Sequence, residues 1–496
     1  MEYDIIFVTG ELYFDHPLCG VAILKRWLEK NGYKVGIIEK PLKEEEITKL
    51  GKPKLFFGVT SGTIDSMVRN YTPLKRKRDE DAYVDYDEQV PDRAVSVYSN
   101  WIKHMYKGTV LVLGGTEASL RRFVHYDYWQ NRLRKPILFD TRADIMAYGS
   151  AEKQILEIAE RVKAGKDLKG IEGTCVISKE KVGKELPTYE EVVDSKEKFC
   201  DMQNMFTNRT NLCQKIDNRY VVQYIYPEYT SKDLDEYYEM DFTRKAPKGL
   251  KGFEFSVVTH RGCIGNCNFC AVRLLQGDRI ISRSEESILR EVKKITKMDL
   301  FRGNIDDLSG PSANMYGMDC NQCGRDCIDC DQLDRTNKRL IKLLRRIRKV
   351  EGVKKLSIRS GIRYDLTSVE LIDDIAEFHV FNDLKIAPEH VNEKVLKLMN
   401  KDRGDLMEFV KYFAKTGRKL SFYFMTAHPG STMDDAEDLG DAVYNLKNAE
   451  KVQIFTPTPM TVSTCMYYTA MDPKTKKRIY VPYTYNEKKK QKRVCF

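Results

Sequence analysis

The chain has 496 residues, which is too many for one ordinary hydrophobic core and indicates about two to four domains. No apolar run is long enough to span a membrane, so we expect no membrane partner. The amino terminus lacks a secretion signal, and 13 cysteines in such a chain indicate metal or redox chemistry rather than disulfides. We therefore expect a cytoplasmic protein, whose net charge of +10 is compatible with an anionic partner.

The first 185 residues alternate short apolar runs with helical patterns. Asp4–Thr9, Tyr33–Ile38 and Leu55–Thr60 are predicted to be buried strands, and Pro17–Lys30 has the apolar spacing of a helix. Such alternation is typical of a parallel sheet with helices on both faces. The sequence therefore predicts an α/β fold with an N-terminal Rossmann-like domain over residues 1–185.

Residues 186–247 are charged and rich in tyrosine, and their periodicity is weaker. Glu191–Cys213 is predicted to form one helix, and Tyr220–Tyr226 a strand that the following proline ends. We expect this segment to be a connector or lid between two domains.

Regular alternation resumes over residues 248–470. Apolar runs with helices between them are predicted to be strands: Phe253–Val258, Phe301–Asp306, Leu356–Arg359, Leu384–Ala387, Leu420–Met425 and Val452–Phe455. About six β/α units predict a partial parallel (β/α)6 barrel of the TIM type, with its active site at the carboxyl ends of the strands. A cysteine-rich insert occupies residues 317–334, and residues 471–496 are predicted to be a basic, solvated tail.

Cys263, Cys267 and Cys270 form a C-x3-C-x2-C array directly after the first predicted strand of this barrel. Three thiolates on one tight loop can bind three irons of a four-iron cluster and leave the fourth iron open. Zinc prefers four ligands, so His260 would have to complete a zinc site here. The array therefore favours a [4Fe-4S] cluster over zinc.

A second group, with the spacing C-x2-C-x3-C-x2-C, consists of Cys320, Cys323, Cys327 and Cys330. Four thiolates suit either a structural zinc or an auxiliary [4Fe-4S] cluster. The group lies a few residues after Gly310–Tyr316, which places it at the active-site end of the predicted barrel and favours the cluster. Zinc and free thiols stay open as alternatives.

The first array, with Phe269 before its third cysteine, resembles the radical-SAM signature. Longer motifs over nearly the whole chain resemble the YgiQ-like radical-SAM family, whose function is unsettled: Val8–Pro17, Phe57–Gly62, Leu113–Arg122, Gly310–Tyr316, Gly361–Asp365, Ala387–His390, Ala427–Gly430 and Pro457–Pro459. The resemblance implies that the cluster's open iron binds S-adenosylmethionine (SAM) and cleaves it reductively. The product would be a radical that abstracts hydrogen from an unidentified substrate.

The stretch Arg279–Arg283 is similar to the matching part of methylthiotransferase-type radical-SAM enzymes. There, arginines near the cluster neutralise charge around the cofactor. The resemblance implies this role for Arg279 or Arg283, and an ordinary surface arginine beside a helix start is the alternative.

The predicted strand ends supply further cofactor positions. Gly310 and Pro311 resemble the glycine-rich stretch that receives the methionine amino group, although a tight turn is the alternative. Arg359 or Glu389 is expected to contact the ribose or carboxylate of SAM, unless it forms a buried salt bridge. Four polar residues are candidates to line the substrate cavity: Arg363, Asp365, His390 and His428.

The N-terminal domain resembles the cobalamin-binding domain that precedes many radical-SAM barrels, with Gly114-Gly115 and Gly149–Glu152 in the expected places. Asp15 and His16 lack the Asp-x-His-x-x-Gly spacing of a cobalt ligand, so we expect a domain without cobalamin. The resemblance also implies an external electron donor of the flavodoxin or ferredoxin type.

The sequence thus predicts a radical-SAM enzyme whose reaction and substrate, RNA or protein among them, it does not determine. The alternative is an iron–sulfur or zinc module that binds RNA or a protein without radical turnover. The net charge and the basic helix predicted at Arg335–Lys349 motivate that alternative.

Overall fold

The computed structural model describes the chain apart from a few short stretches, namely over residues 2–78, 90–247, 252–320 and 327–495. Within these ranges, no helix is both long enough and apolar enough to cross a membrane.

The chain forms two compact units, and each takes segments from distant parts of the sequence. Unit 1 consists of Met1–Glu228, Met240–Lys251 and Pro457–Lys477. Unit 2 consists of Tyr229–Glu239, Gly252–Thr456 and Arg478–Phe496. These units differ from the domains predicted with boundaries at residues 185, 247 and 470. Unit 1 continues to Glu228 and includes Pro457–Lys477, and unit 2 includes Tyr229–Glu239.

Unit 1 is built on a nine-stranded sheet of order β2-β1-β3-β4-β7-β8-β11-β10-β9. Its first five strands are parallel: β2 (Val35–Glu39), β1 (Ile5–Thr9), β3 (Phe56–Thr60), β4 (Val110–Leu113) and β7 (Ile145–Ala147). This order is that of a doubly wound sheet of the flavodoxin type. The predicted Rossmann-like α/β domain is therefore confirmed.

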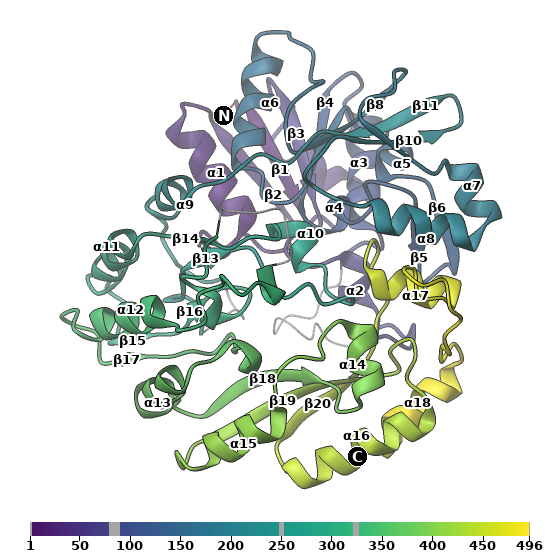
Figure 1. The fold of residues 1–496 in the computed structure, drawn as a ribbon. Helices are drawn as coiled ribbons and strands as arrows, with labels where there is room; N and C mark the ends of the chain where they lie inside the picture. The colour runs from purple at the N-terminus through teal and green to yellow at the C-terminus, as the bar shows by residue number, and fades with distance from the viewer. Residues whose placement is uncertain (1, 79–89, 248–251, 321–326, 496) are drawn as a thin grey trace. The chain divides into compact units, whose positions relative to one another are not determined.

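Helices bury the sheet of unit 1. Helices α1 (Gly20–Lys30) and α6 (Glu152–Lys163) lie side by side on the face that carries Ile5 and Phe7 (Figure 1). All five residues of β1 are buried, as expected for a strand covered on both faces. Other helices of this unit are α2 (Ser66–Asn70), α3 (Ala94–Met105), α4 (Gly115–Ser119), α5 (Ile137–Thr141) and α17 (Val462–Thr469).

The segment predicted to be a connector instead extends this sheet. Strands β8 (Thr174–Ser178), β11 (Arg219–Gln223), β10 (Leu212–Ile216) and β9 (Lys184–Leu186) continue it beyond β7. The single helix predicted over 191–213 is wrong. Helix α7 (Tyr189–Asp194) ends at Ser195, whose extended backbone and side chain cap a new helix, α8 (Lys196–Met205).

Unit 2 contains a partial barrel of parallel strand segments. Parallel pairs join β12 (Val257–Val258) to β16 (Leu308–Ser309) and β15 (Asn304–Ile305) to β17 (Lys355–Leu356). A parallel bridge between Ile362 and Ile386 leads to the sheet of β18 (Asp383–Glu389), β19 (Lys419–Thr426) and β20 (Ala449–Ile454). The predicted partial (β/α)6 barrel is therefore confirmed.

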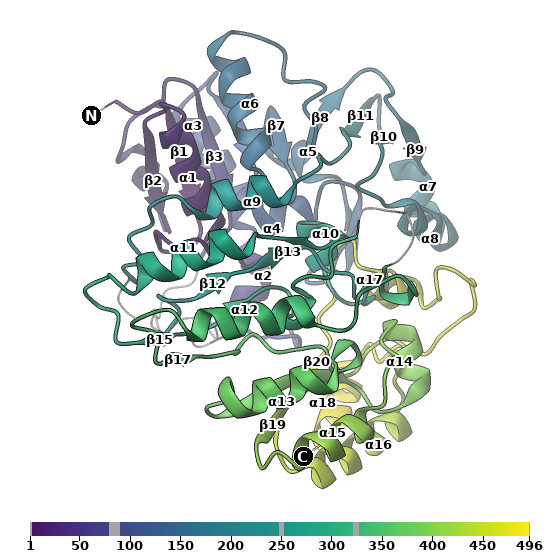
Figure 2. The same ribbon diagram turned by 60° about the vertical axis from the view of Figure 1, so that its left-hand side comes forward.

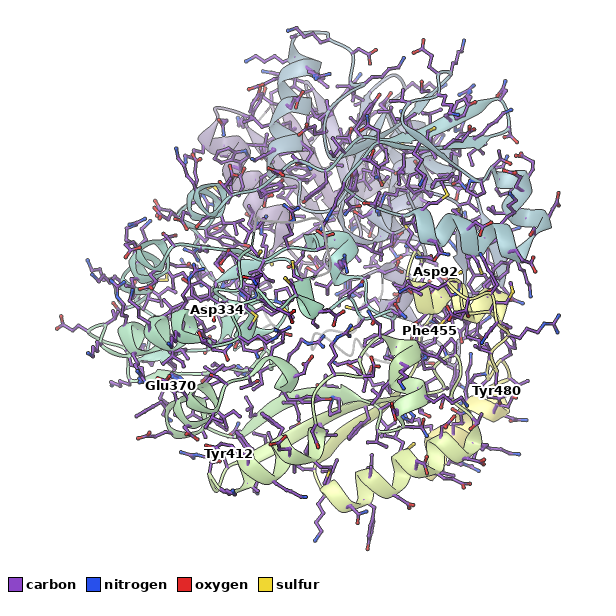
Figure 3. All side chains as sticks on the ribbon, viewed as in Figure 1. Asp92, Asp334, Glu370, Tyr412, Phe455 and Tyr480 are labelled. Atoms are coloured by element: carbon purple, nitrogen blue, oxygen red, sulfur yellow. The ribbon has the colours of Figure 1, made fainter. Side chains whose placement is uncertain are left out.

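The helices of unit 2 lie along the outer side of these strands (Figures 1 and 2). They are α9 (Ser231–Tyr238), α11 (Glu285–Ile295), α12 (Lys338–Arg348), α13 (Val369–Phe378), α14 (Glu393–Met399), α15 (Leu406–Ala414) and α16 (Met433–Leu446). Tyr412 of α15, labelled in Figure 3, donates a hydrogen bond to Asp373 of α13 at 3.0 Å. The apolar faces of α11, α12, α13, α15 and α16 form one core with the strands.

The carboxyl-terminal residues are not a solvated tail. Thr484 caps helix α18 (Tyr485–Val494) through a capping box with Glu487. Gln491 is fully buried, and its amide bonds the loop Ala427–Ser431 through Ala427 N, at 3.0 Å, and the carbonyl of Ser431, at 2.7 Å. The sequence did not predict this packing, because α18 is mostly basic and only a narrow face of it is buried.

Candidate functional site

The cysteine loop lies between two short antiparallel strands of unit 2, β13 (His260–Arg261) and β14 (Ile281–Ser282). Gly262 has a φ of +87°, and a Cβ there would lie 1.7 Å from the carbonyl oxygen of Arg279. Only glycine permits this close approach of the two ends of the loop. Cys263 N donates to the carbonyl of Gly277 at 3.1 Å and so closes the loop further.

Asparagines fix the loop against helix α14, which follows strand β18. Asn268 donates from its backbone to Met399 O and from its side chain to Leu398 O, both at 2.9 Å. Asn400 donates to the carbonyl of Asn266 at 2.7 Å. The loop is therefore held at the carboxyl end of the barrel strands, where barrel enzymes carry their active sites.

The sulfurs of Cys263 and Cys267 accept hydrogen bonds from a backbone amide of the loop and from a neighbouring arginine. Gly265 N donates to Cys263 Sγ, and Arg363 Nη1 donates to Cys267 Sγ, each at 3.4 Å. A Cβ on Gly265 would lie 2.5 Å from Arg363 Nη1, so glycine is needed for the guanidinium to reach the sulfur.

Buried charges surround the cysteines. Arg363 is 7% exposed and forms a two-point ion pair with Asp365, with distances of 3.0 and 2.6 Å. Lys401 Nζ lies 3.6 Å from Glu389 Oε1, and both side chains are largely buried. Burial raises the pKa of Cys270 to about 12, and the neighbouring cysteines and Glu389 add to this.

These residues fit a cluster better than a single metal ion. Across the described ranges, no three histidine, cysteine or acidic side chains are placed to hold one ion. In a four-iron cluster each cysteine binds a different iron, so the sulfurs need not converge. Donors aimed at sulfur are the surroundings that a thiolate-bound cluster requires. His260, the fourth ligand of the zinc alternative, bonds Thr259 Oγ1 through Nδ1 at 2.8 Å.

The two arginines predicted to neutralise charge differ in environment. Arg283 is fully buried, donates to Val258 O and Ser287 Oγ at 2.8 Å and pairs with Glu291. It is therefore not the surface arginine of the alternative. These structural partners occupy Nη1 and Nη2, whereas the buried Nε has no partner within the described residues. Arg279 is half-buried at the end of the cysteine loop, and Phe269 is half-buried within it.

Gly310 and Pro311 follow strand β16, and Gly310 lies against His260 of strand β13. A Cβ on Gly310 would lie 2.1 Å from Cε1 of the buried His260 ring, so a larger residue would displace that ring. The packing against His260 therefore explains the glycine at position 310 without any contact to a cofactor.

The two candidates for SAM contacts also differ. Glu389, the last residue of β18, has a φ of +71°, a conformation that costs an L-residue roughly 1–3 kcal/mol and concentrates at functional sites. Arg359 is exposed and donates to Gly252 O at 2.8 Å. Asp307, whose pKa burial raises, accepts from Arg359 N at 2.7 Å.

The two histidines predicted to line the substrate cavity follow strands β18 and β19 and are buried. His390 Nδ1 accepts from Asn392 N at 3.0 Å, and its Nε2 has no partner within the described residues. His428 Nδ1 bonds the carbonyl of Pro429 at 2.8 Å, and its ring contacts Phe455, labelled in Figure 3. Burial lowers the pKa of His390 to about 4 and that of His428 to about 3.

Part of the second cysteine group can be placed. Cys327 is buried in an apolar cluster with Ile264 and Ile280, and Cys263 packs against that cluster. Cys320 and Cys330 are half-buried, and Cys323 lies outside the described residues. The described part of this group thus adjoins the first cysteine loop.

Sequence reasoning missed several residues that support the loop. Lys401, Asn266, Asn268 and Asn400 carry no local signal, because their contacts come from distant parts of the chain. Asn314, within the glycine-rich motif, donates to Arg363 O at 2.8 Å and accepts from Arg363 N at 2.9 Å.

In unit 1, the loops at the carboxyl ends of β1 and β3 are bridged by side chains. Glu11 accepts from Thr63 N and Thr63 Oγ1, both at 3.0 Å. Gly115 has a φ of +79° and packs closely on Thr60. The His16 ring contacts Leu18 N through Nδ1 at 3.0 Å and Arg244 through Nε2 at 2.9 Å, so both ring nitrogens have protein partners.

The basic helix α12 is neutralised by its neighbours. Arg348 pairs with Asp374 at 3.0 Å, and Arg345 pairs with Glu370, labelled in Figure 3, at 3.2 Å. Arg346 pairs with Glu285 at 2.5 Å. These ion pairs connect α12 to α13 and α11, so its charge does not form an open phosphate-binding patch.

Comparison with known families agrees with this site. The model described as Radical SAM N-terminal matches residues 1–255, and the Radical SAM superfamily model matches residues 257–443, which include the first cysteine loop. The fold and sequence therefore define a radical-SAM enzyme, as predicted.

Curated relatives give the family. A UPF0313 protein of Methanocaldococcus jannaschii is 42% identical over 538 residues, covering 100% of this chain and 89% of its own. A UPF0313 protein of Fusobacterium nucleatum is 41% identical, with coverages of 99% and 95%. The chain belongs to the UPF0313 family, also called the YgiQ family, which confirms the predicted family.

Solved structures share the fold at low sequence identity. The radical SAM methyltransferase TsrM from Kitasatospora setae, with cobalamin and a [4Fe-4S] cluster bound, has a TM-score of 0.58 at 13% identity and is matched over 94% of this chain and 76% of its own. The cobalamin-dependent radical enzyme OxsB has a TM-score of 0.53 at 12% identity, with coverages of 93% and 55%. Both proteins hold cobalamin, so the expectation of a domain without cobalamin gains no support.

Proposed function

We propose that Cys263, Cys267 and Cys270 hold a [4Fe-4S] cluster at which the enzyme cleaves SAM. The observation that carries this proposal is the arrangement of the three cysteines on one closed loop at the barrel's carboxyl end, with N–H donors aimed at two of the sulfurs. When bound, such a cluster supplies the electron that splits the sulfonium of SAM into methionine and a 5′-deoxyadenosyl radical.

The residues around the loop would orient SAM. Glu389, strained and beside Cys270, is the favoured acceptor for a ribose hydroxyl or the methionine ammonium, and Lys401 would hold its carboxylate in place. The His260 ring fills the place that a side chain at Gly310 would take, so the backbone carbonyls of Gly310 and Pro311 are the candidate acceptors for the methionine ammonium. Arg279 and Phe269 of the cysteine loop are further candidates for contacting SAM. Arg283, whose Nη1 and Nη2 bind other residues, and Arg359, which is exposed, are less favoured for this role.

The substrate would lie beyond SAM, among groups at the ends of β18 and β19. His390 and His428 would enter this region as neutral imidazoles, because burial keeps their pKa values low. The electron would come from a flavodoxin- or ferredoxin-like donor. Cobalamin binding by unit 1 would favour methyl transfer, and a unit 1 without cobalamin would favour another radical reaction.

The test is anaerobic reconstitution of the full chain with iron and sulfide. The wild type should gain about four irons at the first site and release methionine and 5′-deoxyadenosine from SAM. Cys263→Ala, Cys267→Ala and Cys270→Ala should each abolish cleavage, while Cys19→Ala, in unit 1, should keep it. Undiminished cleavage in the three variants would refute the proposal.

For Cys320, Cys323, Cys327 and Cys330 we propose an auxiliary [4Fe-4S] cluster, with zinc as the alternative. The packing of Cys263 against the apolar cluster of Cys327 supports a position close to the first site. Metal analysis of the reconstituted chain should then give about eight irons and little zinc. One zinc per chain that chelators remove would favour the scaffold role instead.

The RNA- or protein-binding alternative without radical turnover lacks a supporting observation. Its main motivation, the basic helix α12, is paired with acidic residues. Salt-sensitive RNA binding without SAM cleavage under strong reductant would revive it.

A further inference from the structure

Arg363 and Asp365 were predicted to line the substrate cavity, but their contacts point to another role. We propose that this buried ion pair sets the reduction potential of the cluster held by Cys267. Arg363 would raise the potential, and Asp365 would lower it. The inference rests on the proposed function, because it concerns the same cluster.

The geometry is that of a guanidinium divided between two anionic partners. Nε and Nη2 of Arg363 bind the two carboxylate oxygens of Asp365 at 3.0 and 2.6 Å, and Nη1 donates to Cys267 Sγ at 3.4 Å. Both side chains are largely buried, at 7% and 3% exposure, so water screens this interaction little.

The backbone of Arg363 is held as firmly as its side chain. Asn314, itself fully buried, accepts from Arg363 N at 2.9 Å and donates to Arg363 O at 2.8 Å and to Leu366 O at 3.1 Å. On the sulfur side, a side chain at Gly265 would occupy the place of Nη1. The donor is therefore preorganised toward the sulfur and would not need to reorient when the cluster is bound.

Reduction adds one negative charge to the cluster. A hydrogen bond and a positive charge at a ligating sulfur stabilise the reduced form and raise the potential, and a buried carboxylate nearby has the opposite effect. The pair therefore combines one group that favours reduction with one that opposes it. Substituting the two partners should shift the potential in opposite directions, which a merely structural ion pair would not do.

The experiment is a redox titration of the reconstituted full chain, followed by the electron paramagnetic resonance signal of the reduced cluster. Because a second cluster would add its own signal, the variants are compared in a background with Cys327→Ala. Arg363→Gln should shift the potential to a more negative value, and Asp365→Asn to a more positive one. Arg363→Lys keeps the positive charge but loses the planar guanidinium that bonds Asp365 and Cys267 together. Its potential should lie between those of the wild type and Arg363→Gln.

Arg345→Gln is the matched control, because it removes a half-exposed arginine of the same unit whose partners are carboxylates alone. It should leave the potential unchanged. Unchanged potentials in Arg363→Gln and Asp365→Asn, or shifts of both in one direction, would overturn the inference. If Arg363→Gln takes up no iron, the sign for Asp365→Asn decides. A wild type that binds no cluster would instead refute the proposed function itself.

Discussion

Burial keeps several histidines neutral in the folded chain. His125 in unit 1 is 2% exposed and bonds the carbonyl of Phe123 through Nδ1 at 3.1 Å. Burial, with the charge of nearby Arg121 adding to it, lowers the pKa of His125 to about 3. The unfolded chain protonates this imidazole below about pH 6.5, whereas the folded chain does not.

This difference makes stability depend on pH. The unfolded state binds more protons below pH 6.5, so the contribution of His125 to folding is complete above that pH and is lost as the pH falls toward 3. Between pH 6.5 and 5 the loss should be about 2 kcal/mol. Urea unfolding of His125→Asn should therefore show a shallower pH dependence than the wild type.

His104, whose side chain is 75% exposed, provides the control for this prediction. His104→Asn should keep the steeper wild-type dependence on pH. Equal slopes for His125→Asn and the wild type would show that the imidazole is charged in the folded state or that its proton uptake is offset elsewhere.

For individual residues, the sequence predicted the positions of the cysteines and of the strand-end residues but not their contacts. The cysteines are readable because metal ligation imposes a local spacing. The contacts of Arg363 with Cys267 and of Glu389 with Lys401 join different elements, so no local spacing predicts them. The burial of Arg283 could not be predicted, because its carboxylate partner, Glu291, lies two turns along the next helix.

Among elements, helix α18 shows how a close backbone approach is built. A Cβ on Gly440 of α16 would lie 2.0 Å from the carbonyl oxygen of Val494 at the end of α18. Cys495, next in the chain, is 1% exposed and donates to Gln491 O at 3.2 Å. The two helices can therefore pack only because residue 440 has no side chain.

Gly440→Ala should separate the end of α18 from α16, because the clash is with backbone and cannot be relieved by a rotamer. The cost of such overpacking is roughly 1–3 kcal/mol. Alkylation of Cys495, measured by mass spectrometry, should become on the order of tenfold faster, since ~1.4 kcal/mol corresponds to tenfold. Asp441→Ala, at the exposed neighbouring position, should leave the rate unchanged, and so would Gly440→Ala if α18 were not packed here.

Element types were largely predictable because apolar periodicity reports burial directly. The buried strands β1 and β3 and the alternation of strands and helices in the barrel were predicted correctly. Helices α7 and α8 merged into one prediction because the break at Ser195 depends on a single cap. The tail prediction failed because lysines of α18 outnumber its few buried residues.

For the whole molecule, the segment Pro457–Lys477 is packed in unit 1 although it follows the barrel in sequence. Gln203 donates to Met460 O at 3.0 Å, and Asn204 donates to Pro473 O at 2.8 Å. Tyr467 of α17 packs on Tyr126 and Tyr128 with ring centroids 6.1 and 5.6 Å apart. No periodicity in the sequence assigns a helix to one domain rather than another.

Tyr467→Ala should therefore destabilise unit 1 rather than the barrel that precedes it. Removal of a buried aromatic side chain costs about 3–5 kcal/mol. Hydrogen exchange should accelerate in α8 and in residues 123–134, and remain unchanged in β19 and β20. Tyr444→Ala, at a position 82% exposed, is the control and should change neither. Faster exchange confined to the barrel strands would contradict this assignment.

The return of the chain to unit 1 also determines when that unit can be completed during translation. Glu228 leaves the ribosome long before Lys477, the last residue of unit 1. At ~5–20 residues per second, the roughly 250 residues between them take on the order of 12–50 s to synthesise. During that interval the aromatic surface around Tyr126 and Tyr128 lacks its covering helix α17, so we expect the nascent amino-terminal part to expose apolar surface that a chaperone can bind.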